Sequence, residues 1–209
     1  MQTTFRATPA TRLVAAALLS LGALAASPVQ AQSGAFTLSS PDLAGGSFDN
    51  KFVLNGFGCK GENVSPALEW KNVPAGTKSL SLLVHDPDAP TGSGFWHWTV
   101  LNMPAGTTGL PQGAGNSPAT LPAPAFGGNT DFMDTGATGV NGNYGGPCPP
   151  VGDKPHHYHF TLYAVGVDDV QKAAGVPKTG SAALYSFVLN KGIGAGLLGT
   201  ATFTATYGR

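Results

Sequence analysis

The chain has 209 residues with eleven basic and eleven acidic side chains, so its formal net charge is zero at neutral pH. It has no stripe of lysine and arginine of the kind that binds nucleic acid or anionic lipid, and we expect neither of these partners. Thirty glycines, seventeen prolines and 42% hydrophobic residues indicate a β-rich fold with ordered loops and a packed core, and they argue against a disordered chain.

Residues 1–31 have the features of a secretory signal peptide. Arg6 and Arg12 form a basic start, residues 13–26 are apolar, and the letters VQA that end at Ala31 have the form of a signal-peptidase site. The apolar run is shorter than the roughly 20 residues of a membrane span, and a retained N-terminal anchor is the alternative. We therefore expect residues 32–209 to form a single exported domain, periplasmic or secreted, without stable membrane insertion.

The two cysteines, Cys59 and Cys148, both lie in the part that we expect to be exported. In an oxidising compartment an even pair of cysteines indicates one disulfide. This bond would close a loop of about 90 residues, for which the chain-entropy model gives roughly 4–5 kcal/mol of stabilisation. A redox or metal-binding pair is the weaker alternative, because the sequence has no CxxC spacing.

Six short runs alternate between apolar and polar residues with the two-residue period of β-strands. Clusters of turn-forming residues separate them, most clearly at 72–77 and 86–94. The chain is therefore predicted to be mainly β. The six predicted strands are FTLSS from Phe36, KFVLN from Lys51, SLSLLVHD from Ser79, FWHWTVLNM from Phe95, HYHFTLYAV from His157 and TATFTATY from Thr200.

Two helices are predicted after the fifth of these strands. The first begins at Asp168 or Asp169, either of which can cap it, and ends at Gly175. The second covers residues 181–191 and ends at Gly192. Its predicted face at the i, i+3, i+4, i+7 spacing consists of Leu184, Phe187, Val188 and Lys191.

Three of the predicted strands carry a polar side chain at the end of an apolar face, as the two-residue period assigns them. The three faces consist of Leu80, Leu82, Val84 and Asp86; of His97, Thr99 and Leu101; and of His156, Tyr158, Phe160 and Leu162. The opposite faces of the same three strands carry, in order, His85; Trp96 and Trp98; and His157, His159 and Tyr163. We expect Trp96 and Trp98 to pack in the core. An apolar wall with a few polar groups is typical of a small-ligand site. Three unrelated, solvated strand ends are the alternative.

The motifs that contain these polar residues resemble those of the phosphatidylethanolamine-binding protein family. They are DPDAP at 86–90, FWHW around His97, and GPCPPVGDKPHHYHFTLYA at 146–164, in the order and spacing of that family. The segments at 56–70 and 73–80 are similar to its bacterial Raf-kinase-inhibitor-like branch, and the resemblance runs from about Phe36 to Arg209. It implies a fold of two antiparallel β-sheets with one or two short helices. It also implies one cavity that binds anions such as phosphate, acetate or a phospholipid head group.

The resemblance also implies which residues form the cavity. Carried over position by position, the pocket residues are Asp86, His97, His156 and Tyr158. Asp88 and Pro90 hold the DPDAP turn, and the loop with Gly146 and Pro149 forms the rim of the cavity. The family usually has arginine where this chain has His157, which alternation directs away from the pocket. We therefore expect less positive charge nearby but an intact site.

The expected chemistry of this site depends on its histidines. A neutral imidazole donates one hydrogen bond, whereas a protonated imidazole donates two and adds a positive charge. We expect His97 and His156 to hold an anionic oxygen, with the Tyr158 hydroxyl as a further donor. Asp86 is expected to orient a histidine and raise its pKa, or to accept a hydrogen bond from a ligand amine or hydroxyl. Tighter anion binding at mildly acidic pH follows from this arrangement.

The preferred interpretation is therefore an exported protein that binds a small anionic ligand, without a cofactor and without catalysis. One alternative is an inhibitor of a protease or kinase, for which residues 106–146 offer a long loop without periodicity. Another is a weak hydrolase that uses Asp86 and His97 as acid and base, although the sequence has no GxSxG nucleophile motif. A metal site of His85, His97 and His156 is disfavoured, because alternation places His85 on the other face.

Overall fold

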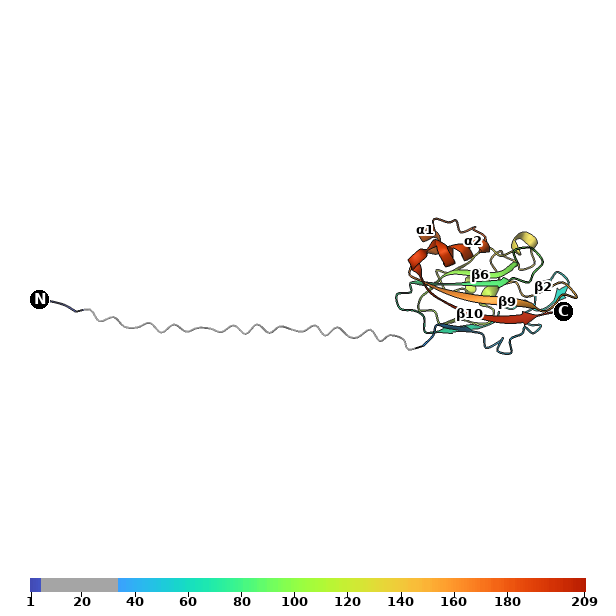
Figure 1. The fold of residues 1–209 in the computed structure, drawn as a ribbon, viewed down its shortest axis with the longest axis horizontal. Coiled ribbons are helices and arrows are strands. Elements are labelled where there is room, and N and C mark those ends of the chain that lie inside the picture. The colour runs from blue at the N-terminus through green and yellow to red at the C-terminus, as the bar shows by residue number, and fades with distance from the viewer. Residues whose placement is uncertain (5–33) are drawn as a thin grey trace. The chain divides into compact units, whose positions relative to one another are not determined.

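The computed structural model describes residues 1–4 and 34–209, so most of the predicted signal peptide lies outside the described residues. In the described part, antiparallel strands form the body of the molecule, and the helices are few and short (Figure 1). The predicted mainly β class with antiparallel sheets is thus confirmed. No helix among these residues has the length and apolar character needed to cross a bilayer.

The larger sheet has five antiparallel strands in the order β10-β9-β5-β6-β8. Its strands are β5 (Ser79–Asp86), β6 (Phe95–Pro104), β8 (Phe126–Gly127), β9 (His156–Val165) and β10 (Leu197–Tyr207). Four of the five were predicted with nearly the same bounds, because each contains a long run of side chains with the two-residue period of a strand. The two-residue strand β8 is too short to give such a pattern.

A second antiparallel sheet has the order β1-β4-β7, and a separate short hairpin pairs β2 with β3. The strands are β1 (Thr37–Ser39), β2 (Asn55–Gly56), β3 (Cys59–Lys60), β4 (Leu68–Lys71) and β7 (Gly109–Leu110). Of these, β1 was predicted. The main core lies between the two larger sheets, where Leu38 and Trp70 join Leu82 and Phe160 in one buried cluster.

The predicted strand KFVLN is wrong. Residues 51–54 form a turn and an irregular segment in which Phe52, Val53 and Leu54 are all buried. Consecutive burial is not the alternation of a half-buried strand. The backbone of this segment is satisfied by other loops: Leu54 donates its N–H to the carbonyl oxygen of Pro147 at 3.2 Å, and Asn63 donates to Val53 at 2.8 Å.

Two α-helices lie together along one side of the strands (Figure 1). Helix α1 (Val170–Ala174) begins after Asp169, whose carboxylate accepts from the N–H of Lys172 at 3.0 Å, and Gly175 ends it in the left-handed conformation. Helix α2 (Ala182–Phe187) is capped by Ser181 and continues as a π-helical turn over Val188–Gly192. The cap of α1 is one of the two predicted, and the Ser181 cap of α2 was not predicted.

The predicted buried face of the second helix is right only in part. Val188 is buried and Leu184 packs against the same cluster, whereas Phe187 is 62% exposed and Lys191 is exposed. Tyr185 and Leu189, which were not predicted, are buried and pack in the cluster that contains Leu83 of β5. Apolar residues occupy more than one face of this helix, so their spacing did not decide the orientation. Contact with the outer face of the larger sheet selects the face that contains Tyr185.

Residues 106–146 are mostly irregular but well packed. They contain β7, β8 and three short 3₁₀ turns, and they bury Phe132 and Tyr144 in the main core. The Tyr144 hydroxyl donates to the carbonyl oxygen of Phe52 at 2.9 Å. This segment therefore forms part of the wall around the site described below.

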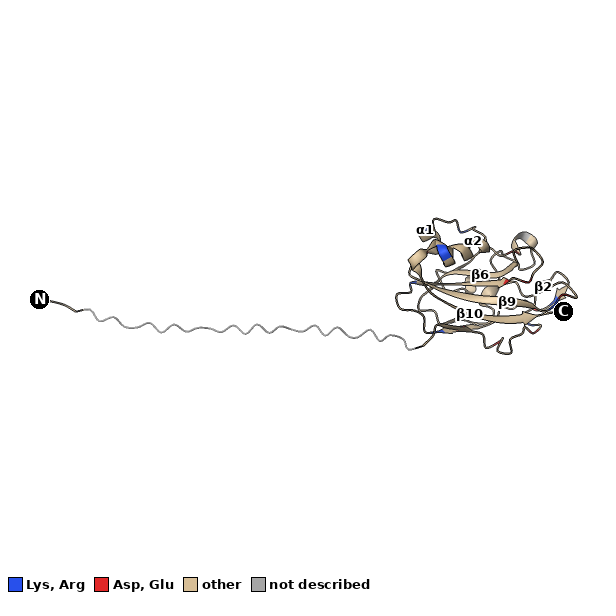
Figure 2. Cartoon of the chain, in the orientation of Figure 1, with Lys and Arg blue, Asp and Glu red and all other residues tan. Residues whose placement is uncertain are grey.

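Cys59 and Cys148 form a disulfide, with their Cα atoms 6.0 Å apart, which confirms the predicted pairing. The bond joins β3 to the loop before β9, so it holds together two segments that are 89 residues apart in the chain. Figure 2 shows that the charged residues are few and scattered along the ribbon.

Candidate functional site

A small cavity of about 140 Å³ opens at one end of the strands of the larger sheet, where β5 ends and where β6 and β9 begin. Because these strands are antiparallel neighbours, residues at their adjoining ends meet. The structure thus brings together all four predicted pocket residues. The cavity is lined by Leu54, Phe57, Asp86, Ala89, Pro90, Thr91, Phe95, His97, Phe132, Cys148, Pro149, Pro150, His156 and Tyr158.

A β-bulge in β6 aims His97 into this cavity. Trp96 pairs with His85 and Trp98 pairs with the preceding residue Val84, so His97 is an extra residue on β6. As a result Trp98 packs in the main core on the same side as His97. The prediction that these two side chains lie on opposite faces was wrong, because strict alternation does not hold across a bulge. The expected core packing of Trp98 is confirmed.

Asp86 is buried, and both of its carboxylate oxygens are occupied. One oxygen accepts the backbone N–H groups of Asp88 at 2.9 Å and Ala89 at 3.2 Å, so the DPDAP segment turns around its own first side chain. The other oxygen accepts from Nδ1 of His156 at 2.7 Å. Asp86 therefore orients His156, as expected, and three of the roughly four hydrogen bonds that a carboxylate can accept come from the protein.

His156 is buried at the start of β9, and its surroundings favour its protonated form. Burial acts to lower its pKa, but the hydrogen bond and negative charge of Asp86 oppose this, with help from Asp153, and the net effect is a raised pKa. Nε2 of His156 lies 3.4 Å from a carboxylate oxygen of Asp153. No lysine or arginine is among the residues that line the cavity, so protonated His156 is the cationic group of the lining.

His97 behaves differently, because its partner is a carbonyl group. Its Nδ1 lies 2.9 Å from the carbonyl oxygen of Gly145, which can only accept, so Nδ1 carries a hydrogen and donates it. Burial lowers the pKa of His97 to about 4, and the ring is therefore neutral near pH 7. The neutral ring has one N–H group, and this group already donates to Gly145. The expectation that neutral His97 donates to an anion is thus wrong.

The hydroxyl group of Tyr158 is available to a ligand. Its ring is buried, packing edge-to-face against His97 and Phe48 with centroids 5.0 and 5.2 Å apart. Burial raises the pKa of Tyr158, so the hydroxyl keeps its proton. Within residues 34–209 the hydroxyl has no hydrogen-bond partner, although Tyr158 lines the cavity. It can donate one hydrogen bond to a ligand and accept another.

The residue after His156 holds the DPDAP turn. His157 is exposed, and both its backbone N–H and its Nδ1 lie within hydrogen-bond distance of one Asp88 oxygen, at 2.7 and 2.8 Å. These hydrogen bonds lower the pKa of Asp88. His157 thus points away from the cavity, as alternation predicted, and Asp88 serves the turn. Pro90 of the same turn lines the cavity.

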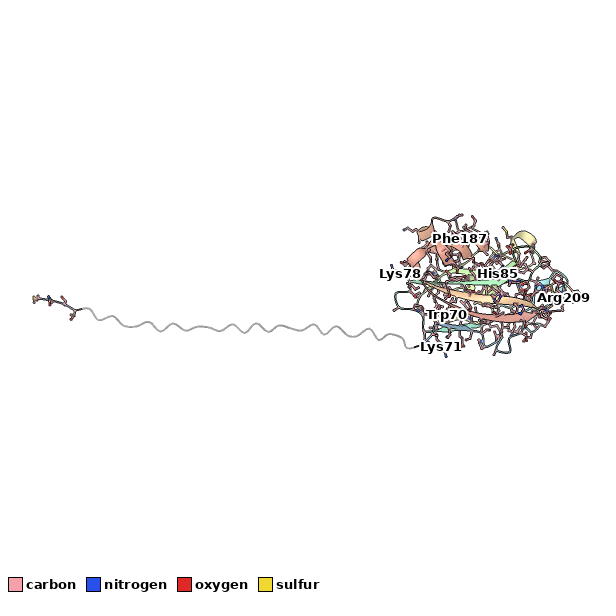
Figure 3. The ribbon with its side chains drawn as sticks, in the orientation of Figure 1. Trp70, Lys71, Lys78, His85, Phe187 and Arg209 are labelled. Atoms are coloured by element: carbon pink, nitrogen blue, oxygen red, sulfur yellow. A yellow bond between two sulfur atoms is a disulfide. The ribbon has the colours of Figure 1, made fainter. Side chains whose placement is uncertain are left out.

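The two predicted rim residues have different positions. Pro149 lines the cavity, and its carbonyl oxygen accepts from Nε of Arg209 at 2.6 Å. Arg209 lies at the end of the molecule where β10 finishes (Figure 3). Gly146 is not among the lining residues; its N–H donates to the side chain of Asn63 at 2.8 Å, behind the rim. Its assignment to the ligand-contacting set is corrected, because the loop turns its backbone toward residues 52–54.

Three aromatic side chains of the cavity were not predicted. Phe95 and Phe132 meet edge-to-face with centroids 4.9 Å apart, and Phe57 stacks on Phe132 at 5.9 Å. Phe95 pairs with Asp86 and stands two residues before His97, so alternation along β6 places it on the cavity face and could have predicted it. Phe57 and Phe132 come from irregular segments, where no period assigns a direction to a side chain.

The structure gives no support to the metal-site alternative. His85 stacks on Trp96 with ring centroids 4.1 Å apart, and its Nε2 lies 3.1 Å from the carbonyl oxygen of Ser93. It therefore lies on the face of the sheet opposite the cavity. In the described part of the chain, no three His, Cys, Asp or Glu side chains are grouped so that they could hold a metal ion.

Comparison with known proteins agrees with this architecture. The sequence profile described as phosphatidylethanolamine-binding protein matches residues 44–207, which is most of the chain and includes every residue of the site. The chain belongs to the phosphatidylethanolamine-binding protein family. The resemblance seen in the DPDAP, FWHW and HHYH motifs is thus confirmed over residues 44–207.

Two relatives within the family come from Escherichia coli strain K12. The protein YbcL is 44% identical over 179 residues, which cover 85% of this chain and 90% of YbcL. The protein YbhB is 44% identical over 139 residues, which cover 66% of this chain and 83% of YbhB. The crystal structure of E. coli YbcL, titled a new member of the mammalian PEBP family, aligns with a TM-score of 0.71 and 42% identity. That alignment covers 83% of this chain and 98% of the YbcL chain.

Proposed function

We propose that this member of the phosphatidylethanolamine-binding protein family binds a small anionic ligand, such as phosphate or a phospholipid head group, in the cavity at the ends of β5, β6 and β9. The observation that carries the proposal is the convergence of His156, held by Asp86, and the unpartnered Tyr158 hydroxyl on one cavity. Its volume of about 140 Å³ is below the roughly 300–1,000 Å³ of drug-sized pockets, so it suits a head group rather than a whole lipid.

Binding is a better fit to this geometry than hydrolysis. A general base needs a free oxygen or nitrogen within reach of the proton that it removes. The carboxylate of Asp86 already accepts three hydrogen bonds from protein groups. Nε2 of His97 has a free lone pair, but burial lowers the pKa of His97 to about 4, which makes it a weak base near neutral pH. Cys59 and Cys148 are joined to each other and do not present a thiol nucleophile. These features favour a site that holds its ligand unchanged.

Export of the protein is part of the same proposal. The basic start, apolar run and VQA site within residues 1–31 support it. The disulfide supports it independently, because such bonds form and persist in oxidising compartments. The ligand would then be met in the periplasm or outside the cell.

The proposal is tested by calorimetric titration of the purified protein with phosphate, phosphoethanolamine and ethanolamine. We expect the two phosphate-containing ligands to bind and the substitution His156→Gln to weaken them at least about tenfold, which corresponds to the loss of one charge-assisted hydrogen bond of about 1.5–3 kcal/mol. Phosphate affinity should also fall as the pH rises above neutrality, because His156, whose pKa is raised, then loses its proton.

His157→Gln is the matched control, because His157 is adjacent in sequence but bonds to Asp88 outside the cavity. It should leave the affinity for phosphate nearly unchanged. Binding of ethanolamine without binding of phosphate would refute the anion site and indicate an amine site. Equal phosphate affinity in wild type and His156→Gln would show that the ligand binds elsewhere.

A further inference from the structure

The ring of His97 is held in one orientation by two hydrogen bonds to the same residue. Its Nδ1–H donates to the carbonyl oxygen of Gly145 at 2.9 Å, and the N–H of Gly145 donates to the backbone carbonyl of His97 at 3.0 Å. This exchange fixes the position of the carbonyl that orients the ring. Edge contacts with Phe132 and Tyr158, at centroid distances of 5.4 and 5.0 Å, restrict the ring from both sides.

The hydrogen on Nδ1 decides what the other ring nitrogen can do. A neutral imidazole with its hydrogen on Nδ1 has a lone pair on Nε2, which accepts hydrogen bonds and donates none. Within the described residues no protein group donates to this nitrogen, and the His97 ring lines the cavity. Nε2 of His97 is not one of the fully buried side-chain atoms that lack a partner in the described residues, so it is open to the cavity. A ligand P–OH group can donate a hydrogen bond to it there, and a fully ionised phosphoryl group cannot.

The groups that face His97 do not change its role. On β5, Asp86 favours protonation of the ring and His85 opposes it, and both effects are smaller than that of burial. On β9, His156 gives its Nδ1–H to Asp86, and Tyr158 has its own hydroxyl directed at the ligand space. Phe95 and Phe132 contribute only hydrocarbon. Nothing among these groups supplies Nε2 of His97 with a proton.

We propose that His97 determines the protonation state of the ligand: it accepts a hydrogen bond from a ligand P–OH group and so selects a singly protonated phosphoryl group over a fully ionised one. His156 and Tyr158 would donate to the unprotonated oxygens of the same group. The ligand class is then a phosphomonoester or phosphonate monoanion, and sulfate and sulfonates are excluded. This inference rests on the proposed anion-binding function of the cavity.

The test uses two anions of the same charge and similar shape, of which only one carries a hydroxyl hydrogen. Near pH 5, methylphosphonate and methanesulfonate are both monoanions of similar shape, but only methylphosphonate carries a hydroxyl hydrogen. We expect the purified protein to bind methylphosphonate at least tenfold more tightly than methanesulfonate in calorimetric titrations. A site built to pair with a hydroxyl group discriminates strongly against an analogue that lacks it.

The variant His97→Gln links this preference to the residue, because a glutamine amide can turn its N–H₂ group toward an ionised oxygen. In this variant the preference for methylphosphonate should fall toward equality. The control His157→Gln should keep the wild-type preference. Circular dichroism establishes that both variants are folded.

The outcomes separate this inference from the function on which it rests. Equal binding of the two probes by the wild-type protein would overturn the role of His97 and leave the anion site standing. A preference that survives in His97→Gln would also overturn it. If neither probe binds, the proposed function fails, and the inference fails with it.

Discussion

At the scale of single residues, the two pocket histidines differ because their Nδ1 atoms meet different acceptors. Both side chains are buried, and burial by itself disfavours the imidazolium ion. In His156 the Nδ1–H group meets the Asp86 carboxylate, which offsets this cost and raises the pKa. In His97 it meets an uncharged carbonyl, and the pKa falls to about 4. One cavity thus contains an imidazole donor and an imidazole acceptor.

The low pKa of His97 predicts how stability depends on pH. Between about pH 6.5, where an unfolded histidine titrates, and about pH 4, the unfolded chain binds a proton at residue 97 that the folded chain does not. Acidification through this range therefore favours unfolding, by about 2 kcal/mol at pH 4.5. We expect His97→Gln to lose correspondingly less stability than wild type between pH 7 and 4.5 in urea unfolding.

The raised pKa of His156 acts in the opposite direction. Its contribution to stability is present at low pH and is lost as the pH rises through the folded-state pKa. It is common to wild type and to His97→Gln, so it cancels when the two are compared. Parallel stability profiles for the two proteins would contradict a neutral, buried His97.

At the scale of elements, the bulge in β6 and the loop before β9 shape the cavity. The bulge places both His97 and Trp98 toward the space between the sheets, where a regular strand would place only one of them. The loop presses the backbone of residue 146 against residues 52–54, and Pro149 of the same loop reaches the rim. The irregular backbone of the bulge and of the loop thus places cavity residues whose positions side-chain alternation does not predict.

Gly146 tests the close approach of these two backbone segments. A Cβ atom at this position would collide with the carbonyl oxygen of Phe52 and would lie 2.6 Å from the backbone nitrogen of Leu54. We expect Gly146→Ala to lower the free energy of unfolding by about 1–3 kcal/mol, because rigid backbone cannot move aside easily. Urea unfolding monitored by tryptophan fluorescence measures this change.

The matched control is Gly106→Ala, since a Cβ atom there meets nothing within 4 Å and the residue does not have a positive φ. Its unfolding free energy should stay within about 0.5 kcal/mol of wild type. Similar small effects of the two substitutions would mean that the loop before β9 is not pressed against residues 52–54 in solution.

At the scale of the whole molecule, the larger sheet is covered on both faces. Its inner face packs against the β1-β4-β7 sheet, and its outer face carries α1 and α2. This double cover explains why β5 is buried along nearly its whole length. The cavity therefore lies at the ends of the strands, where loops from distant parts of the chain close over them.

The disulfide is the covalent link in that closure. Cys148 lines the cavity, and Cys59 belongs to the β2-β3 hairpin next to Phe57. Replacing both cysteines with serine should reduce the free energy of unfolding by up to about 4–5 kcal/mol, as expected for a loop of this length. Equilibrium urea unfolding of the variant, and of wild type with and without reductant, measures the effect.

Reduction of the wild-type protein should reproduce the loss seen in the double variant. Phosphate affinity should fall as well, because the rim of the cavity would lose its attachment to β3. An unfolding free energy that is insensitive to reductant would contradict this role of the bond. A stable variant with unchanged affinity would show that the noncovalent contacts of the rim are sufficient.

The sequence by itself determined the features that arise from neighbours in the chain. The alternation of β5, β9 and β10, a helix that begins at Asp168 or Asp169 and ends at Gly175, and the shared face of His156 and Tyr158 all follow from local spacing. The family motifs, once matched, also indicated that Asp86 and His97 belong to the same cavity. Both kinds of signal are visible without knowing which distant segments meet.

Only the tertiary structure decided the features that depend on distant partners. The His97 ring is oriented by Gly145, which is 48 residues away, and this contact makes it an acceptor instead of the expected donor. Phe132 reaches the cavity from a segment without periodicity, and the buried face of α2 was chosen by contact with the sheet. Hydrogen-bond direction and burial are set by whatever the fold brings alongside a side chain, and spacing along the chain does not contain that information.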